Sequence, residues 1–270
     1  MQAAPSASQV GKVRIALRFA RVVLHLLRGL AISAFLFPLT GAAYREQCVR
    51  TWSAQLLAIL RVQLQPMPED AQLPARAALI VANHISWLDI FVINALRPCR
   101  FVAKADIRHW PVLGWLCAKA GTIFIARGRQ REVRRVYQGL VTALQAGERI
   151  AFFPEGTTAA QGTLLPFHAN LFEAAIEAQV PVQPCALRYL DGEGELHRAA
   201  DFIGDTSFVD SLLLILRSSP MRAEIVPLPL IASEGAHRRD LSAQARAAIA
   251  AALMLPADAN STTVPAAADS

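Results

Sequence analysis

The sequence predicts an α/β fold, in which a mixed β-sheet is flanked by helices and a membrane-associated helical hairpin precedes it. Three observations carry this prediction. Short apolar segments alternate along most of the chain with stretches of helical periodicity, the pattern of a sheet covered by helices. The 270 residues, of which 54% are hydrophobic, are enough to bury a sizeable core. The basic residues are concentrated at the N-terminus, outside that alternation.

The N-terminal 64 residues carry the whole excess of positive charge. They contain eight Lys and Arg residues and one acidic residue, whereas residues 65–270 contain 19 basic and 20 acidic residues. Five basic side chains recur every three or four residues, which predicts one face of a helix: Arg14, Arg18, Arg21, His25 and Arg28. A basic stripe beside apolar residues is typical of a helix that lies on an anionic membrane surface.

The next segments predict the rest of the hairpin. The apolar run over 29–39 has 11 residues, fewer than the roughly 20 that span a bilayer. A second helix is expected over 46–63, with the turn near Pro38 and Gly41. Together these features predict attachment to the cytoplasmic face of the inner (cell) membrane, although a soluble helical cap with a solvated arginine face is the alternative. Nucleic-acid binding is not expected, because the remainder of the chain is nearly neutral.

A linker over 65–70, which includes two prolines, is expected to lead into a second domain over 71–255. Apolar segments of strand length lie at 77–82, 100–103, 122–126, 150–153, 182–187 and 224–227. Helices are predicted at 90–96, 112–119, 131–145, 170–178 and 238–255. Residues 256–270 are mostly small or polar, so a disordered tail is expected there.

The four cysteines are scattered, and no pair has the spacing typical of zinc binding or redox chemistry. They are expected to be small apolar residues in a reducing compartment. No HExxH pattern predicts a metal site, and no GxSxG pattern predicts a serine nucleophile. Neither a metal nor a cofactor is therefore expected.

His84 and Asp89 are the most informative pair in the chain. They follow the apolar segment 77–82, at the point where a buried strand would open onto a cleft. A histidine there can take a proton from a hydroxyl near neutral pH, while a carboxylate fixes its tautomer. On one helix the two side chains would point apart, so we place His84 in a turn and Asp89 in the first turn of a helix capped by Ser86. The structural alternative is a capping acid beside a turn histidine.

Further polar candidates follow other expected strands. Arg127 follows 122–126 and offers a planar guanidinium to a phosphate group, although a solvated run of arginines fits equally. Gly156 would let a backbone amide approach an anion, and Glu155 would orient Arg127 or a neighbouring amide. An ordinary turn is the alternative for this pair. Lys104 either lines the entrance to the site or extends from a surface strand.

Four sequence blocks in a fixed order resemble the glycerolipid acyltransferase family, which contains bacterial 1-acylglycerol-3-phosphate acyltransferases. The blocks are Asn83–Asp89, Gly121–Arg127, Phe153–Thr158 and Val180–Pro184. The resemblance covers about residues 80–190. It implies that His84 is the general base and that Asp89 is its orienting partner. The resemblance also implies that four residues help to hold a phosphate-bearing acceptor: Arg127, Glu155, Gly156 and Thr157.

The reaction implied by the resemblance moves an acyl group from acyl-CoA or acyl carrier protein, as the donor substrate, to the free hydroxyl of a lysophospholipid. Conversion of 1-acylglycerol-3-phosphate to phosphatidic acid is the first expectation. The sequence departs from the family pattern at Thr158, where arginine is frequent, and at His168, where lysine is more usual. Because a branch that acylates lyso-ornithine lipids also has two threonines after the glycine, the acceptor stays open between these lysolipids.

Two readings from other functional classes fit the same residues. A thioester hydrolase would use His84 and Asp89 to activate water in place of an acceptor lipid. A membrane-bound scaffold without activity would keep the N-terminal stripe and tolerate changes at His84, Asp89 and Glu155. The relative yield of free fatty acid and esterified lipid separates hydrolysis from transfer.

Overall fold

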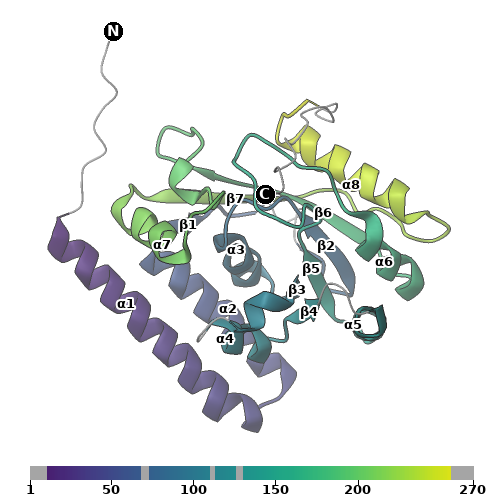
Figure 1. Ribbon diagram of the computed structural model, residues 1–270, viewed down its shortest axis with the longest axis horizontal. Coiled ribbons are helices and arrows are strands. Elements are labelled where there is room, and N and C mark those ends of the chain that lie inside the picture. Colours follow the sequence, from purple (N-terminus) through teal and green to yellow (C-terminus); the bar gives the residue numbers. More distant parts are fainter. Residues whose placement is uncertain (1–10, 68–72, 110–112, 126–129, 257–270) are drawn as a thin grey trace, which may run out of the picture.

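The computed structural model describes residues 11–67, 73–109, 113–125 and 130–256 (Figure 1). At its centre is a seven-stranded sheet with the order β1-β7-β6-β2-β5-β3-β4. Neighbouring strands run parallel, except that β6 and β7 pair antiparallel. The predicted fold class, a mixed sheet flanked by helices, is confirmed.

The strands are β1 (Val62–Leu64), β2 (Ala78–Ala82), β3 (Arg100–Lys104), β4 (Ile123–Ile125), β5 (Arg149–Phe152), β6 (Val182–Leu190) and β7 (Met221–Pro227). The α-helices are α1 (Lys12–Ala31), α2 (Ala42–Ile59), α3 (Leu88–Leu96), α4 (Leu113–Lys119), α5 (Gln130–Gln145), α6 (Glu173–Ala178), α7 (Phe208–Arg217) and α8 (Arg238–Ala252). Short 3-10 or π-helical segments are η1 (Ile32–Leu36), η2 (Phe37–Leu39), η3 (Ala105–His109), η4 (Ala169–Phe172) and η5 (Arg198–Ala200).

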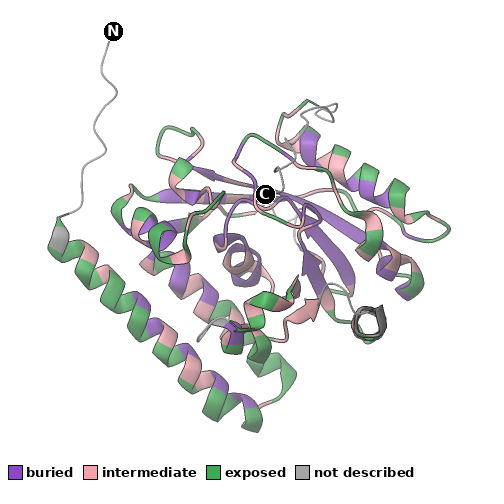
Figure 2. Cartoon of the chain, in the orientation of Figure 1, coloured by how far each residue is buried: buried purple, intermediate pink, exposed green. Residues whose placement is uncertain are grey.

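Helices cover both faces of the sheet, and the side chains of β2 point alternately to two cores. Leu79 and Val81 belong to a core shared with α5, α6 and α8, whereas Ile80 and Ala82 belong to a core shared with α1, α2, α3 and α7. All five residues of β2 are buried, as expected for a central strand covered on both faces. Figure 2 shows the buried sheet between more exposed helices. His84 lies two residues beyond the end of this central strand.

Most predicted elements are present with small shifts at their ends, but β1 and α7 are not predicted. The expected helix over 46–63 ends instead at Ile59, and Arg61, at φ 61°, turns the chain into β1. Three residues are too few for periodicity to reveal a strand. α7 begins after Ser207, whose hydroxyl accepts the backbone N–H of Asp210. The predicted linker beyond Met67 and the predicted tail beyond Pro256 lie outside the described residues.

α1 and α2 form the predicted N-terminal hairpin, with η1 and η2 between them. His25 of α1 stacks on Trp52 of α2, with ring centroids 4.6 Å apart. Nε2 of His25 lies 2.9 Å from the Trp52 carbonyl oxygen, and the Trp52 indole N–H donates to the His25 carbonyl oxygen at 3.1 Å. This reciprocal pair fixes the two helices against each other.

The basic residues of α1 do not form one exposed stripe, so that part of the prediction is wrong. His25 is buried between the helices, and Arg18 turns inward to donate from Nη1 to the Leu216 carbonyl oxygen at 3.1 Å. Arg14, Arg21 and Arg28 are exposed. Helical spacing shows which residues share a face of a helix, but it does not show which face packs against the protein.

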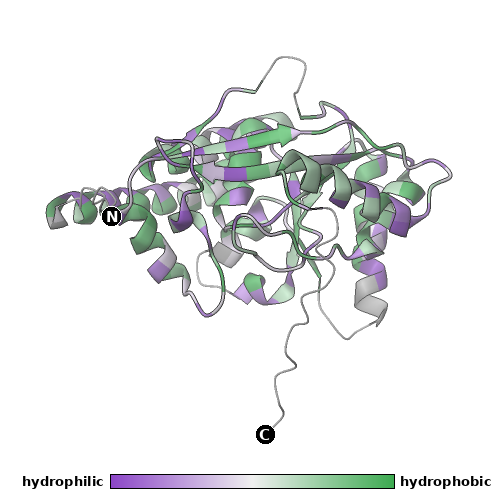
Figure 3. Cartoon of the chain, turned by 90° about the horizontal axis from the view of Figure 1, so that it is seen from above, coloured by the Kyte–Doolittle hydropathy of each residue, from purple (hydrophilic) through white to green (hydrophobic). Residues whose placement is uncertain are grey.

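The outward face of α1 is apolar. Its exposed side chains include Val13, Leu17, Leu24 and Leu27, each of which is more than half exposed. Figure 3 shows that hydrophobic residues are distributed along this helix at one side of the molecule. The helical stretch Val13–Leu39 has 27 residues and is long and apolar enough to cross a membrane, by length and composition. The apolar helical stretch is therefore longer than the 11-residue apolar run over 29–39.

Gly29 provides a test of the hairpin packing. A Cβ atom added there would lie 2.6 Å from Nε1 of Trp52, so Gly29→Ala should displace the indole and break its hydrogen bond. We expect a loss of roughly 1–3 kcal/mol in the free energy of unfolding, despite the gain of about 1 kcal/mol from the better helix former. Thermal unfolding in detergent, followed by tryptophan fluorescence, measures the change.

The matched control is Gly139→Ala in α5, because a Cβ atom at Gly139 meets no atom within 4 Å. That substitution should raise the unfolding temperature. An equal rise for Gly29→Ala would show that the hairpin does not pack as described.

Candidate active site

His84 lies in the turn between β2 and α3, and Asp89 lies in the first turn of α3. Their side chains meet, because Nδ1 of His84 is 2.8 Å from Oδ2 of Asp89. The Asp89 side chain is fully buried, and that of His84 is 19% exposed. Since Nδ1 is engaged by the carboxylate, Nε2 is the ring nitrogen that can accept a proton. The structure thus brings this predicted pair together.

The Asp89 carboxylate is surrounded by hydrogen-bond donors. Besides His84, its Oδ2 accepts the backbone N–H groups of Ile85 at 2.7 Å and Ser86 at 2.9 Å. Its Oδ1 accepts the Tyr189 hydroxyl at 2.7 Å. These contacts satisfy a charge that would be costly to bury without partners.

The predicted cap by the Ser86 hydroxyl is wrong. The N-cap residue of α3 is Trp87, and Oγ of Ser86 is buried with no hydrogen-bond partner among the described residues. Only the carboxylate half of the expected motif forms, in which Asp89 accepts the Ser86 backbone N–H. The turn is therefore organised around the Asp89 carboxylate and not around the serine.

The His84 imidazole lies flat against the Phe153 ring, with centroids 3.9 Å apart and planes 5° from parallel. Phe153 follows β5, and its ring also stacks on Phe101 of β3 at a centroid distance of 5.9 Å. The face of an aromatic ring favours a neighbouring cation. Phe153 thus restricts the rotation of the His84 ring, and its aromatic face would favour a cation at that position.

Asn83 extends the sheet beyond the end of β2. Its Nδ2 donates to the Leu187 carbonyl oxygen at 2.9 Å, and its Oδ1 accepts the Leu187 N–H at 2.8 Å. The side-chain amide thus replaces a backbone pairing between β2 and β6 and fixes the residue that precedes His84. Sequence reasoning does not identify this role, because the two partners are 104 residues apart.

Glu155 holds the backbone of the site. Its Oε1 accepts the His84 N–H and its Oε2 accepts the Leu165 N–H, both at 2.8 Å. Burial raises the pKa of Glu155 to about 7, while the two backbone N–H groups act in the opposite direction. These contacts are with neighbouring backbone amides, one of the two predicted roles for Glu155; the other predicted partner, Arg127, lies outside the described residues.

The loop after Glu155 wraps around His84. The Ala159 N–H donates to the His84 carbonyl oxygen at 2.8 Å. Gly156 has φ 70°, and a Cβ atom there would lie 3.2 Å from Cδ2 of His168, so the position favours glycine for both conformation and space. Thr157 is exposed, whereas the Thr158 hydroxyl donates to the Phe202 carbonyl oxygen. Thr158 is therefore engaged in holding the loop.

Lys104 and Arg127 are the other two predicted site residues. Lys104 is exposed at the end of β3, and no hydrogen bond or ion pair within the described part of the chain links it to the His84–Asp89 pair. Arg127 lies outside the described residues.

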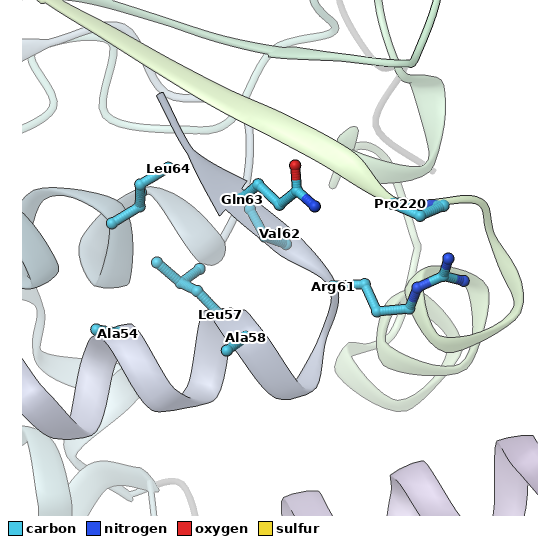
Figure 4. A pocket seen from close by; sticks show the side chains of 8 residues that line it. All are labelled: Ala54, Leu57, Ala58, Arg61, Val62, Gln63, Leu64 and Pro220. Carbon is cyan, nitrogen blue, oxygen red and sulfur yellow. The ribbon is translucent and has the colours of Figure 1, made fainter. Parts of the chain in front are cut away.

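Two pockets differ in their distance along the chain from His84. One of about 220 Å³ is lined partly by Asn83 and Ile85, the two neighbours of His84. A larger one of about 480 Å³ lies between α2 and β1, with Arg61 at one end, and contains no predicted site residue (Figure 4). Within the described ranges, no group of three or more His, Cys, Asp or Glu side chains could hold a metal ion.

Comparisons with known proteins agree with this arrangement. Residues 65–188 match the family described as Acyltransferase. The chain is 38% identical over 250 residues to the lyso-ornithine lipid O-acyltransferase of Pseudomonas aeruginosa, covering 90% of this chain and 95% of that protein. It is 40% identical over 154 residues to the 1-acyl-sn-glycerol-3-phosphate acyltransferase of Neisseria meningitidis, covering 56% of this chain and 59% of that protein.

The fold also resembles the crystal structure of the 1-acyl-sn-glycerophosphate acyltransferase PlsC from Thermotoga maritima. The TM-score is 0.63 at 18% sequence identity, over 88% of this chain and 96% of that one. This likeness concerns the fold alone. The family match and the relative aligned along nearly the whole chain show that the protein belongs to the glycerolipid acyltransferase family and is an acyltransferase.

Proposed function

We propose that the protein transfers an acyl group from a thioester donor to the free hydroxyl of a membrane lysolipid, with His84 as the general base. The observation that carries this proposal is the imidazole held by Asp89 at 2.8 Å, with Nε2 directed away from the carboxylate. A neutral imidazole in this tautomer can remove a proton from an alcohol. The other contacts of the site keep that imidazole in place.

The proposed reaction is one-step acyl transfer. Nε2 of His84 takes the proton of the acceptor hydroxyl as its oxygen attacks the thioester carbonyl carbon, and Asp89 stabilises the imidazolium that forms. A new C–O bond forms, the C–S bond breaks, and the departing thiolate takes the proton from His84. The products are the acylated lipid and the free thiol of the donor, and no acyl-enzyme is required.

The donor in this proposal is acyl-CoA or acyl carrier protein, because both carry the acyl group as a thioester. Glu155 contributes by holding the His84 peptide group, since it accepts the N–H of that residue. Gly156 and Thr157 lie in the loop that wraps around His84 and would face the acceptor headgroup. Arg127 and Lys104 are proposed to meet anionic groups of the acceptor or donor.

We propose a lyso-ornithine lipid as the first candidate acceptor. The relative that aligns over 90% of this chain bears that name, and a relative from Rhodobacter capsulatus with the same name is 32% identical over 88% of it. Thr158 supplies no positive charge where the family pattern often has arginine, and its hydroxyl is already engaged. Lysophosphatidic acid is the second candidate, supported by the 40% identity to the Neisseria protein.

Membrane attachment through α1 is the proposed means of reaching such an acceptor. The outward face of this helix exposes Leu17 and Leu24 at 61% and 68%, and exposed apolar surface of this kind is typical of a membrane contact. The exposed Arg14, Arg21 and Arg28 would bind anionic headgroups. Because the proposed donors are cytosolic molecules, the attachment is placed on the cytoplasmic face of the inner membrane.

The membrane proposal predicts that Leu17→Glu combined with Leu24→Glu weakens binding to anionic phospholipid vesicles by about tenfold or more, since two charges replace buried apolar contacts. Vesicle co-sedimentation measures the binding. The matched control is Leu230→Glu, at a position 54% exposed outside the hairpin, which should bind as the unaltered protein does. Equal binding by all three proteins would exclude α1 as the attachment surface.

The enzymatic proposal predicts transfer of a labelled acyl group to an added lysolipid by membranes that contain the protein. Lyso-ornithine lipid should be the better acceptor and lysophosphatidic acid the second. His84→Ala should lower the rate by about 10²-fold or more, the contribution of a general base, without loss of membrane binding. Thin-layer separation of the labelled products gives the acceptor and the rate.

The control for this assay is His237→Asn, which replaces an exposed histidine at the start of α8 by another good N-cap residue. It should retain full activity. Label that appears mainly as free fatty acid would assign the protein to hydrolysis, and full activity in His84→Ala would remove His84 as the base.

A further inference from the structure

We propose that Tyr189 is a positioning residue for acyl transfer, which acts through Asp89 to set the orientation and basicity of His84. This inference rests on the proposed function. The Tyr189 hydroxyl donates to Oδ1 of Asp89 at 2.7 Å. The other donors to this carboxylate among the described residues, from His84, Ile85 and Ser86, all bind Oδ2. Tyr189 therefore supplies the contact that keeps the second carboxylate oxygen in place.

The fold determines where this hydroxyl lies. The register of β2 and β6 reaches Ala82 and Cys185, and β6 continues for five more residues, to Leu190. Tyr189 thus lies beyond the end of β2, on the side of the sheet that packs against α3. Its side chain is completely buried, so it cannot swing away into solvent.

The backbone of Tyr189 is held on both sides. Its N–H donates to Oε1 of Gln161 at 2.6 Å, and its carbonyl oxygen accepts the His197 N–H at 2.9 Å. Gln161 is itself buried and donates from Nε2 to the His197 carbonyl oxygen at 3.1 Å. This arrangement gives the phenol one position, and from that position it reaches Asp89.

Tyr189 remains a donor over the working pH range. Burial raises the pKa of Tyr189 well above its ordinary value, and the charge and hydrogen bond of Asp89 raise it further. Within the part of the chain that the structure describes, the other titratable group that faces the pair is Glu155, from the loop after β5. Glu155 binds the backbone of His84, whereas among the described residues Tyr189 is the side chain, besides His84 itself, that donates directly to the Asp89 carboxylate.

The expected effect on His84 follows from the distribution of charge on Asp89. A donor at Oδ1 draws negative charge toward that oxygen and weakens the interaction of Oδ2 with the imidazole. Without that donor, Oδ2 stabilises the imidazolium more strongly, so the neutral base appears only at higher pH. The carboxylate also loses the contact that opposes its rotation, and the imidazole is oriented less well.

Tyr189→Phe tests this inference, because it removes only the hydroxyl. We expect kcat to fall about tenfold, while KM for donor and acceptor changes by less than about twofold. The acidic limb of the kcat profile should move upward by about half a pH unit. Activity of the unaltered protein establishes the proposed function separately. Tyr137→Phe, which removes a hydroxyl in the opposite layer, should leave the profile unchanged.

A double-substitution cycle separates a positioning role from a merely structural one. If Tyr189 acts through Asp89, then Asp89→Asn combined with Tyr189→Phe should be little slower than Asp89→Asn alone. A decrease in the rate of the double variant equal to the product of the two single decreases would show that the two residues act independently. The proposal would be overturned if the acidic limb of the kcat profile lay at the same pH in Tyr189→Phe as in the unaltered protein, whatever the thermal stability of the variant.

A second variant keeps the test decisive if Tyr189→Phe does not fold. The chain has three tyrosines, so 3-fluorotyrosine can be confined to position 189 when Tyr44 and Tyr137 are replaced by Phe. A more acidic phenol is a stronger donor, and the acidic limb should then move downward in pH. An upward shift or no shift would contradict a role through Asp89.

Discussion

The hydrogen bond between His84 and Asp89 is the interaction on which the site depends. It joins a strand end to a helix start across 2.8 Å, and it requires a carboxylate that is fully buried. Such a carboxylate is stable only when its oxygens are occupied by donors. The turn amides and Tyr189 provide those donors, while Glu155 and Phe153 hold the histidine itself. The order of strands β5, β2 and β6 places these groups side by side.

The same packing connects the N-terminal hairpin to the site. Trp52 of α2 contacts Phe91 of α3 at a centroid distance of 5.7 Å, and Phe91 contacts Trp87 at 5.9 Å. Trp87 is the N-cap of the helix that carries Asp89. The outward apolar face of α1 therefore belongs to an element that packs continuously with the helix that carries Asp89. Attachment of α1 to a bilayer would fix the site relative to the lipid surface.

Sequence patterns predict the strands that meet at the site and the convergence of His84 with Asp89, because apolar runs and strand-end chemistry are local signals. They do not predict that Asn83 binds Leu187 or that Tyr189 binds Asp89, since each of these contacts joins residues about a hundred positions apart. Ser86 fits a local capping pattern, yet the turn amides bind the carboxylate instead. The inward position of Arg18 and His25 could not be predicted either, because periodicity does not choose between the two faces of a helix.

The most direct test of the central claim is the protonation state of the His84 imidazole, measured by NMR on protein labelled with nitrogen-15 in histidine. The six histidines allow the His84 signals to be assigned by comparison with His84→Gln. The structure predicts that, in the neutral ring, Nδ1 carries the proton, Nε2 carries none, and the Nδ1 proton is hydrogen-bonded to Asp89. Replacing Asp89 by Asn should weaken that hydrogen bond. A proton on Nε2, with Nδ1 unaffected by Asp89→Asn, would contradict it.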